Sequence, residues 1–78
     1  MVSELRFYLD LSPERYLRYY QGTAKAVSVL SIEGKRIEFP AEHLRPYVTH
    51  DGVRGLFSLQ FDENNRFVAL NRLGDLPG

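Results

Sequence analysis

The passage from strand to helix that decides the fold lies in the stretch Leu5-Arg6-Phe7-Tyr8-Leu9-Asp10-Leu11-Ser12-Pro13-Glu14. Every second residue of its first half is apolar, which is the period-two pattern of a half-buried strand. Serine is a good helix N-cap, and proline and glutamate suit the first helical turn. We therefore predict a strand over residues 5–11, followed directly by a helix from Pro13 to about Gln21.

The predicted helix has two faces with different roles. The face that is expected to pack inward carries Tyr16, Leu17 and Tyr20. The opposite, exposed face carries Arg15, Arg18 and Tyr19. Gly22 is expected to end the helix in the left-handed conformation, which glycine adopts without steric cost.

Four further strands are predicted over residues 24–31, 35–39, 53–61 and 66–73. The loop Ile32-Glu33-Gly34 has glycine at its third position, which is typical of a type I turn closed by a bulge. That turn pairs Val29 with Ile37 and Val27 with Phe39, so that apolar side chains share one face. A two-residue turn would instead set Val29 opposite Glu38, so we prefer the bulged register.

The segment over residues 40–46 begins and ends with proline. One helical turn fits near residues 41–45, because the residue before a proline avoids the α region, and Leu44 is expected to anchor it in the core. His50-Asp51-Gly52 repeats the chemistry of the first three-residue turn. In the polar loop over residues 62–65, Asn65 is expected to tolerate the left-handed region.

These elements predict one α+β domain over residues 1–78, with residues 1–3 and 74–78 frayed. The expected order is a strand, a helix and then four strands in an antiparallel meander. Five strands in so short a chain are expected to form a strongly twisted sheet or a small, partly open barrel. The helix is expected to cover one face or one open end.

Composition restricts the classes of protein further. The chain has ten basic and ten acidic residues, so its net charge is zero, and its basic set is eight Arg and two Lys. It has no cysteine, which excludes disulfides and thiolate zinc sites. The N-terminus shows neither a signal peptide nor a membrane span, so a cytoplasmic location is expected.

Three blocks of the chain resemble a known family. They are Tyr16-Leu17-Arg18-Tyr19-Tyr20-Gln21-Gly22, Ile37-Glu38-Phe39-Pro40-Ala41-Glu42-His43-Leu44-Arg45-Pro46 and Asp51-Gly52-Val53-Arg54-Gly55. The family consists of short, uncharacterised proteobacterial proteins with a domain of unknown function, and the likeness covers nearly the whole chain, roughly from Leu5 to Leu73. The resemblance implies a stand-alone bacterial cytoplasmic protein, and it implies no activity, ligand or catalytic residue.

The polar residues form no pattern that is typical of catalysis or metal binding. The two histidines, His43 and His50, match no known ligand spacing, and the loop over residues 62–65 lacks the spacing of a calcium loop. No serine is placed in a nucleophile elbow, and no glycine-rich loop precedes the helix. We therefore expect no enzyme activity, no metal, no cofactor, no membrane partner and no small-molecule substrate.

Two binding functions remain as hypotheses. The first is contact with a protein, either a second copy or another partner, through an edge strand or through the Arg/Tyr face of the helix. The alternative is binding of single-stranded RNA or DNA through Arg side chains and exposed aromatic platforms, for which Tyr8 and Tyr47 are candidates. The candidate binding surface consists of Arg15, Arg18, Tyr19, Arg45 and Arg54.

Overall fold

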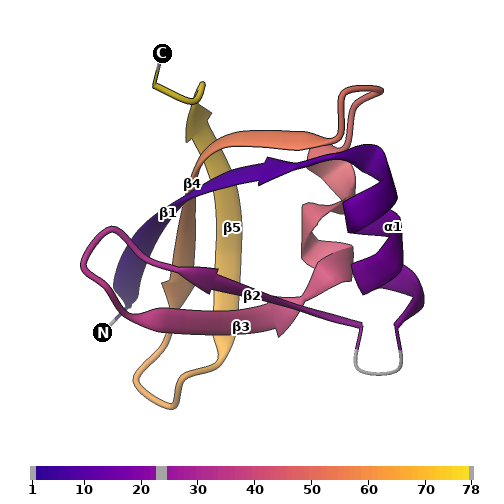
Figure 1. Ribbon diagram of the computed structural model, residues 1–78. Helices are drawn as coiled ribbons and strands as arrows, with labels where there is room; N and C mark the ends of the chain where they lie inside the picture. The colour runs from indigo at the N-terminus through magenta and orange to yellow at the C-terminus, as the bar shows by residue number, and fades with distance from the viewer. Residues whose placement is uncertain (1, 23–24, 78) are drawn as a thin grey trace.

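A computed structural model describes residues 2–22 and 25–77, and within them five strands and two helices follow one another (Figure 1). The elements are β1 (Ser3–Leu11), α1 (Pro13–Gln21), β2 (Ala26–Leu30), β3 (Arg36–Pro40), η1 (Ala41–Tyr47), β4 (Val53–Phe61) and β5 (Phe67–Gly74). The predicted α+β class is confirmed. Neither helix of the described part has the length and hydrophobicity that crossing a lipid bilayer requires.

The strands form two antiparallel sheets instead of one meander. One sheet has the order β1-β4-β5 and the other is the hairpin β2-β3. The predicted meander was therefore wrong between β3 and β4, which belong to different sheets. In place of β3, the strand β1 pairs with β4, from Ser3↔Phe61 to Leu11↔Val53. The helix α1 carries the chain away from β1, and β4 is the strand whose length and alternating apolar face match those of β1.

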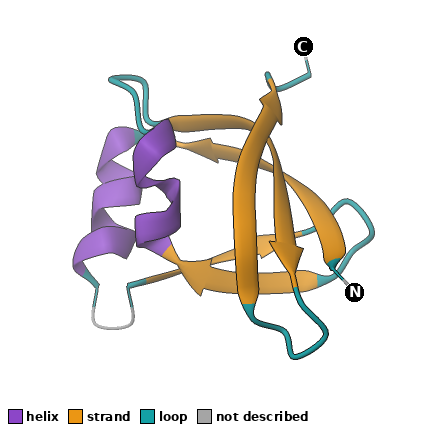
Figure 2. Cartoon of the chain, turned by 180° about the vertical axis from the view of Figure 1, so that it is seen from behind, coloured by secondary structure: helices purple, strands orange, loops and turns teal. Residues whose placement is uncertain are grey.

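The hairpin β2-β3 crosses the strands of the other sheet, and α1 and η1 close one end of the molecule (Figures 1 and 2). The two sheets do not close into a barrel. At one end they are joined by a hydrogen bond of 2.8 Å, in which the Ile32 amide donates to the Arg6 carbonyl. The chain is thus an open, two-layered structure whose sheets retain unpaired edges.

The core lies between the two sheets. Phe7 of β1 is fully buried, and its ring contacts Phe57 in the same sheet at 5.9 Å and Phe39 in the other sheet at 5.7 Å. Leu44 of η1 is also fully buried, which confirms its predicted role as the anchor of that segment. The helical turn is longer than predicted, since η1 continues through Pro46 to Tyr47.

The helix α1 begins as predicted but packs on a different face. The Ser12 hydroxyl accepts a hydrogen bond from the Arg15 amide at 3.2 Å, which confirms the N-cap. Leu17 was expected to pack inward, and this was wrong, since its side chain is 49% exposed. Tyr19 was expected on the exposed face but is partly buried against the core. The inward face is Tyr16, Tyr19 and Tyr20, the i, i+3, i+4 set of one helical stripe.

The end of α1 and the ends of the chain also differ from the predictions. Gly22 is extended, with a φ of −67°, and is not left-handed. Its amide nevertheless closes the last turn by donating to the Tyr19 carbonyl. Ser3 and Gly74, which were expected in frayed ends, are terminal residues of β1 and β5. Ala24, the predicted start of the second strand, lies outside the described residues, and β2 begins at Ala26.

The predicted bulged turn before β3 is confirmed. The Gly34 amide donates to the Ser31 carbonyl, the Ser31 amide donates to the Lys35 carbonyl, and Gly34 has a φ of 88°. As a result Val27 pairs with Phe39, and Val29 with Ile37, in the predicted register.

The turn at residues 50–52 was predicted to resemble the bulged turn at Gly34, and this was wrong. There, the Thr49 amide donates to the Gly52 carbonyl, which closes a tighter loop. The true counterpart lies between β4 and β5, where the Asp62 amide donates to the Arg66 carbonyl and Asn65 adopts a φ of 62°. The predicted left-handed conformation of Asn65 is thereby confirmed.

Candidate protein-binding cleft

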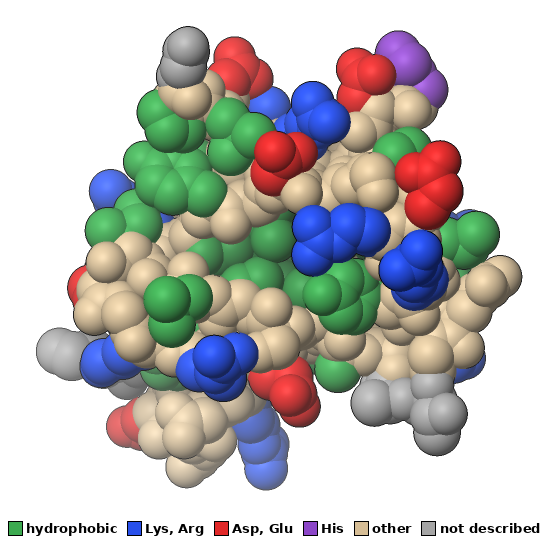
Figure 3. All heavy atoms as spheres, viewed as in Figure 1, with side chains coloured by type: hydrophobic (Ala, Val, Ile, Leu, Met, Phe, Trp, Pro, Cys, Tyr) green, Lys and Arg blue, Asp and Glu red, His purple; other side chains and the backbone are tan. Residues whose placement is uncertain are grey.

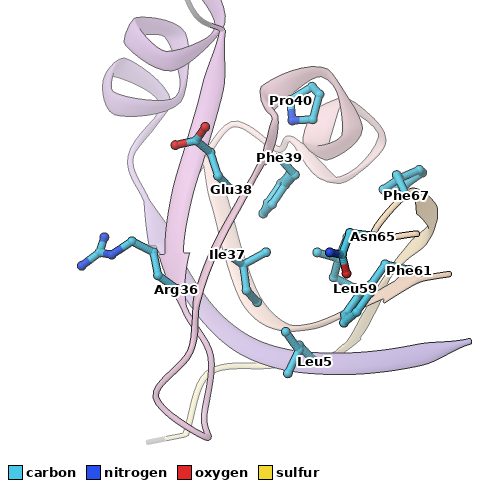
Figure 4. A pocket seen from close by; sticks show the side chains of 10 residues that line it. All are labelled: Leu5, Arg36, Ile37, Glu38, Phe39, Pro40, Leu59, Phe61, Asn65 and Phe67. Atoms are coloured by element: carbon cyan, nitrogen blue, oxygen red, sulfur yellow. The ribbon is translucent and has the colours of Figure 1, made fainter. Parts of the chain in front are cut away.

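An apolar cleft of about 440 Å³ lies beside β3, where the hairpin approaches the ends of the other sheet (Figure 4). All five residues of β3 line it. The opposite wall is formed by Leu5, Leu59, Phe61, Asn65 and Phe67. The cleft therefore lies along the one side of β3 that does not pair with β2.

The hydrogen-bonding pattern of the hairpin shows which backbone groups face this cleft. Before the strand the Ser31 amide donates to the Lys35 carbonyl, and beyond the strand the Ala41 amide donates to the Lys25 carbonyl. Because paired and unpaired positions alternate in an antiparallel ladder, the amides and carbonyls of Arg36 and Glu38 point away from β2. Within residues 2–22 and 25–77, no other backbone group bonds to this edge.

The side chains of β3 alternate in the opposite sense. Ile37 and Phe39 are buried and point into the cleft, whereas Arg36 and Glu38 point away from it (Figure 4). The Arg36 guanidinium donates to the Ser28 hydroxyl at 3.1 Å. In the described part of the chain, neither Arg36 nor Glu38 forms an ion pair. The edge thus presents free backbone groups and two unpaired, opposite charges.

An exposed aromatic residue lies at the far wall of the cleft. Phe67, at the start of β5, is 42% exposed. Its ring stacks on the His43 imidazole, with centroids 3.7 Å apart and planes inclined by 5°. Sequence reasoning placed Phe67 in a strand but did not assign it to a site. The available signal was the pair Phe61 and Phe67, which flanks a polar hairpin loop.

The edge of β5, in contrast, is covered by η1. The Tyr47 hydroxyl donates to the Leu70 carbonyl at 2.6 Å, and its ring packs edge-on against Phe57 at 5.5 Å. Tyr47 was a candidate stacking platform for nucleic acid, but these contacts give it a structural role. Tyr8, the other candidate platform, is 48% exposed.

The structure divides the candidate Arg/Tyr surface among three hollows. Arg15, Arg18 and Tyr19 line the first, and neither Arg has a carboxylate partner among the described residues. Arg45 lines a second hollow, between α1 and the end of η1. Arg54 lines a third and pairs with Asp10 at 2.9 Å. The fold therefore brings together only the three residues of α1.

Charges of both signs are mixed on the face seen in Figure 3, with basic side chains over the two helices.

The hydroxyl of Ser58 and the guanidinium of Arg6 lower the pKa of the Glu4 carboxyl, although Ser58 makes no hydrogen bond of ordinary geometry. His50 lies at the surface beside Asp51. No group of three metal-binding side chains gathers within the part that the structure describes.

Comparison with the curated proteins and with the solved structures found no match. A family model, by contrast, matches residues 3–73, which is nearly the whole chain. This match confirms the resemblance that the three sequence blocks indicated. The chain belongs to the family described as Protein of unknown function (DUF2835).

Proposed function

We propose that this chain is a non-enzymatic protein-binding domain that takes up an extended segment of a protein along the free edge of β3. The observation that carries the proposal is the unpaired row of backbone groups at Arg36 and Glu38, which lies directly beside an apolar cleft. A strand added to a sheet edge gains main-chain hydrogen bonds, and side-chain pockets at alternate positions give it specificity. Both parts of such a site are present at β3.

The alternation of the edge defines the chemistry of the segment. Residues opposite Ile37 would share its face and enter the cleft, so they are expected to be apolar. Residues opposite Arg36 and Glu38 would lie on the outer face, where an acid and a base respectively are favoured. Pro40 has no amide proton, so the added strand is expected to end at that position.

The test is a selection from a display library of random linear peptides on the purified chain, with the binding of selected peptides measured by titration. Glu38→Pro removes an outward amide and leaves the pairing with β2 intact, so we expect it to weaken binding by about tenfold or more. Glu38→Ala keeps that amide and is the matched control, for which we expect a change of about threefold at most.

Two outcomes would contradict the proposal. One is a selection that yields no binding peptides. The other is a set of peptides that bind Glu38→Pro as tightly as the unmodified chain, because they must then use another surface. Hydrogen exchange of the backbone amides provides a second readout, since only a peptide that adds as a strand at this edge would slow the exchange of the Arg36 and Glu38 amides.

A second candidate function is binding of single-stranded nucleic acid through α1. It is favoured by one observation, the hollow in which the unpaired Arg15 and Arg18 lie beside Tyr19. Titration with labelled single-stranded RNA and DNA at low salt tests it, with Arg15→Ala/Arg18→Ala as the variant. Absence of binding at low salt would exclude this function, and binding that the variant retains would exclude this surface.

A further inference from the structure

The sequence of the free edge is complementary to itself. Arg36, Ile37 and Glu38 form a base, an apolar residue and an acid in succession. When a second β3 runs antiparallel to the first with the two Ile37 residues opposite each other, Arg36 lies opposite Glu38 in both directions. One arrangement thus satisfies both charges of each chain, which is the requirement of an interface with twofold symmetry.

The backbone alternation agrees with the same register. The groups that point outward belong to Arg36 and Glu38, and these are the residues that would face each other as hydrogen-bonded pairs. The Ile37 residues would form the intervening pair without hydrogen bonds, in which side chains approach most closely. Charge complementarity and hydrogen-bonding phase are separate conditions. A shift of one β3 against the other by one residue would violate both.

We infer that the segment bound at this edge is β3 of a second copy of the chain, which joins the two hairpins into one four-stranded sheet, β2-β3-β3-β2. The inference rests on the proposed function, because it names the partner of the same edge. Paired residues share a face, so the partner's Ile37 enters the cleft that Phe61 and Phe67 line. This contact gives the exposed Phe67 ring an apolar neighbour.

The interface is expected to be small. Gly34 would lie opposite the proline at position 40, which cannot donate a hydrogen bond, so pairing is confined to the residues around Ile37. So short an interface lies at the low end of the size range for specific complexes. We therefore expect a dissociation constant of about 10–1000 µM, within reach of sedimentation equilibrium with concentrated protein.

The test uses exchange of charge across the edge. Arg36→Glu and Glu38→Arg each bring like charges together in both pairs, so each variant alone is expected to be monomeric. Mixed together, the two variants restore an acid opposite a base at every pair, so a mixed dimer is expected. The double variant Arg36→Glu/Glu38→Arg is expected to dimerise on its own at about the affinity of the unmodified chain.

A matched pair on α1, Arg18→Glu and Glu14→Arg, controls for net charge. Each of these variants carries the same net charge as its counterpart on β3, so association upon mixing them would show that general attraction is sufficient and would overturn the inference. Circular dichroism of every variant shows whether each one folds.

The remaining outcomes separate this inference from the proposed function. If the unmodified chain stays monomeric at millimolar concentration while library peptides still bind at β3, the second copy is excluded and the proposed function stands. Dimers that neither single charge reversal weakens would place the interface elsewhere and would overturn the inference. Peptides that bind equally to Glu38→Pro would overturn the proposed function itself.

Discussion

The two strands β3 and β5 each pair with one neighbour only, yet their outer edges differ. The outer edge of β5 lies against η1, where Tyr47 bonds to the Leu70 carbonyl and His43 stacks on Phe67. The outer edge of β3 faces a cleft, and no described backbone group bonds to it. Both strands carry apolar and charged side chains, so composition does not explain the difference.

The difference follows from the path of the chain. The segment η1 begins at Ala41, immediately after β3 ends at Pro40. This segment leaves β3, which precedes it, and covers the edge of β5, the last strand. Since uncovered edges invite pairing with other chains, the edge of β3 is available for association, whereas η1 obstructs association at the edge of β5. The following predictions break or sharpen this contrast, from the largest expected effect to the smallest.

Removal of the anchor of η1 should have the largest effect. Leu44→Ala empties a fully buried site and is expected to lower the free energy of unfolding by about 2–5 kcal/mol. It should also loosen the cover of β5 and increase self-association. Urea unfolding measures the first effect and light scattering the second. Leu17→Ala, on the exposed face of α1, is the control and should change the free energy of unfolding by less than about 0.5 kcal/mol. Equal losses of stability in the two variants would contradict the packing described for η1.

Proline substitutions should distinguish inward from outward amides. The Leu70 carbonyl faces η1, so the amide of the next residue, Asn71, points inward towards its partner Ser58. Asn71→Pro is therefore expected to cost about 3 kcal/mol of unfolding free energy. Glu38→Pro, at an outward amide, should cost less than about 1 kcal/mol. Chemical denaturation measures both, and a reversed order would show that the edge of β3 is not the open one.

The hydrogen bond that covers β5 should contribute a smaller amount. Tyr47→Phe removes the hydroxyl that bonds to the Leu70 carbonyl, with an expected loss of about 1–2 kcal/mol in unfolding free energy. Amide exchange in β5 should accelerate while exchange in β3 stays unchanged. Tyr8→Phe, at an exposed position, is the control and should be neutral. A neutral Tyr47→Phe would mean that η1 protects this edge without the hydroxyl.

The attachment of η1 to α1 should make stability depend on alkaline pH. The buried Tyr16 hydroxyl donates to the Ala41 carbonyl at 3.2 Å, and burial raises the pKa of Tyr16 above its ordinary value of 10.0. The unfolded chain therefore releases this proton first, so the contribution is fully present below pH 10 and is lost as pH rises further. The free energy of unfolding, measured across that pH range, should fall less steeply for Tyr16→Phe than for the unmodified chain. An identical slope would contradict this coupling.

Local features were predictable because they depend on neighbours in the sequence. The alternation before Ser12 predicted β1, and the serine and proline predicted the start of α1. The glycine at position 34 predicted the register that pairs Val27 with Phe39. On α1 the prediction failed for Leu17, since sequence alone does not show around which residue the buried stripe is centred.

The sequence by itself determined the class of each element, the N-cap of α1 and the turn at Gly34, since these follow from hydrophobic period, N-cap chemistry and backbone sterics over a few residues. Only the tertiary structure decided that β1 pairs with the distant β4, that Phe67 and Ile37 line the same cleft and that η1 covers the edge of β5 and not that of β3. Those outcomes depend on the directions in which α1 and η1 leave their strands. Such directions are set by packing of the whole core around Phe7 and Leu44, and no local pattern specifies them.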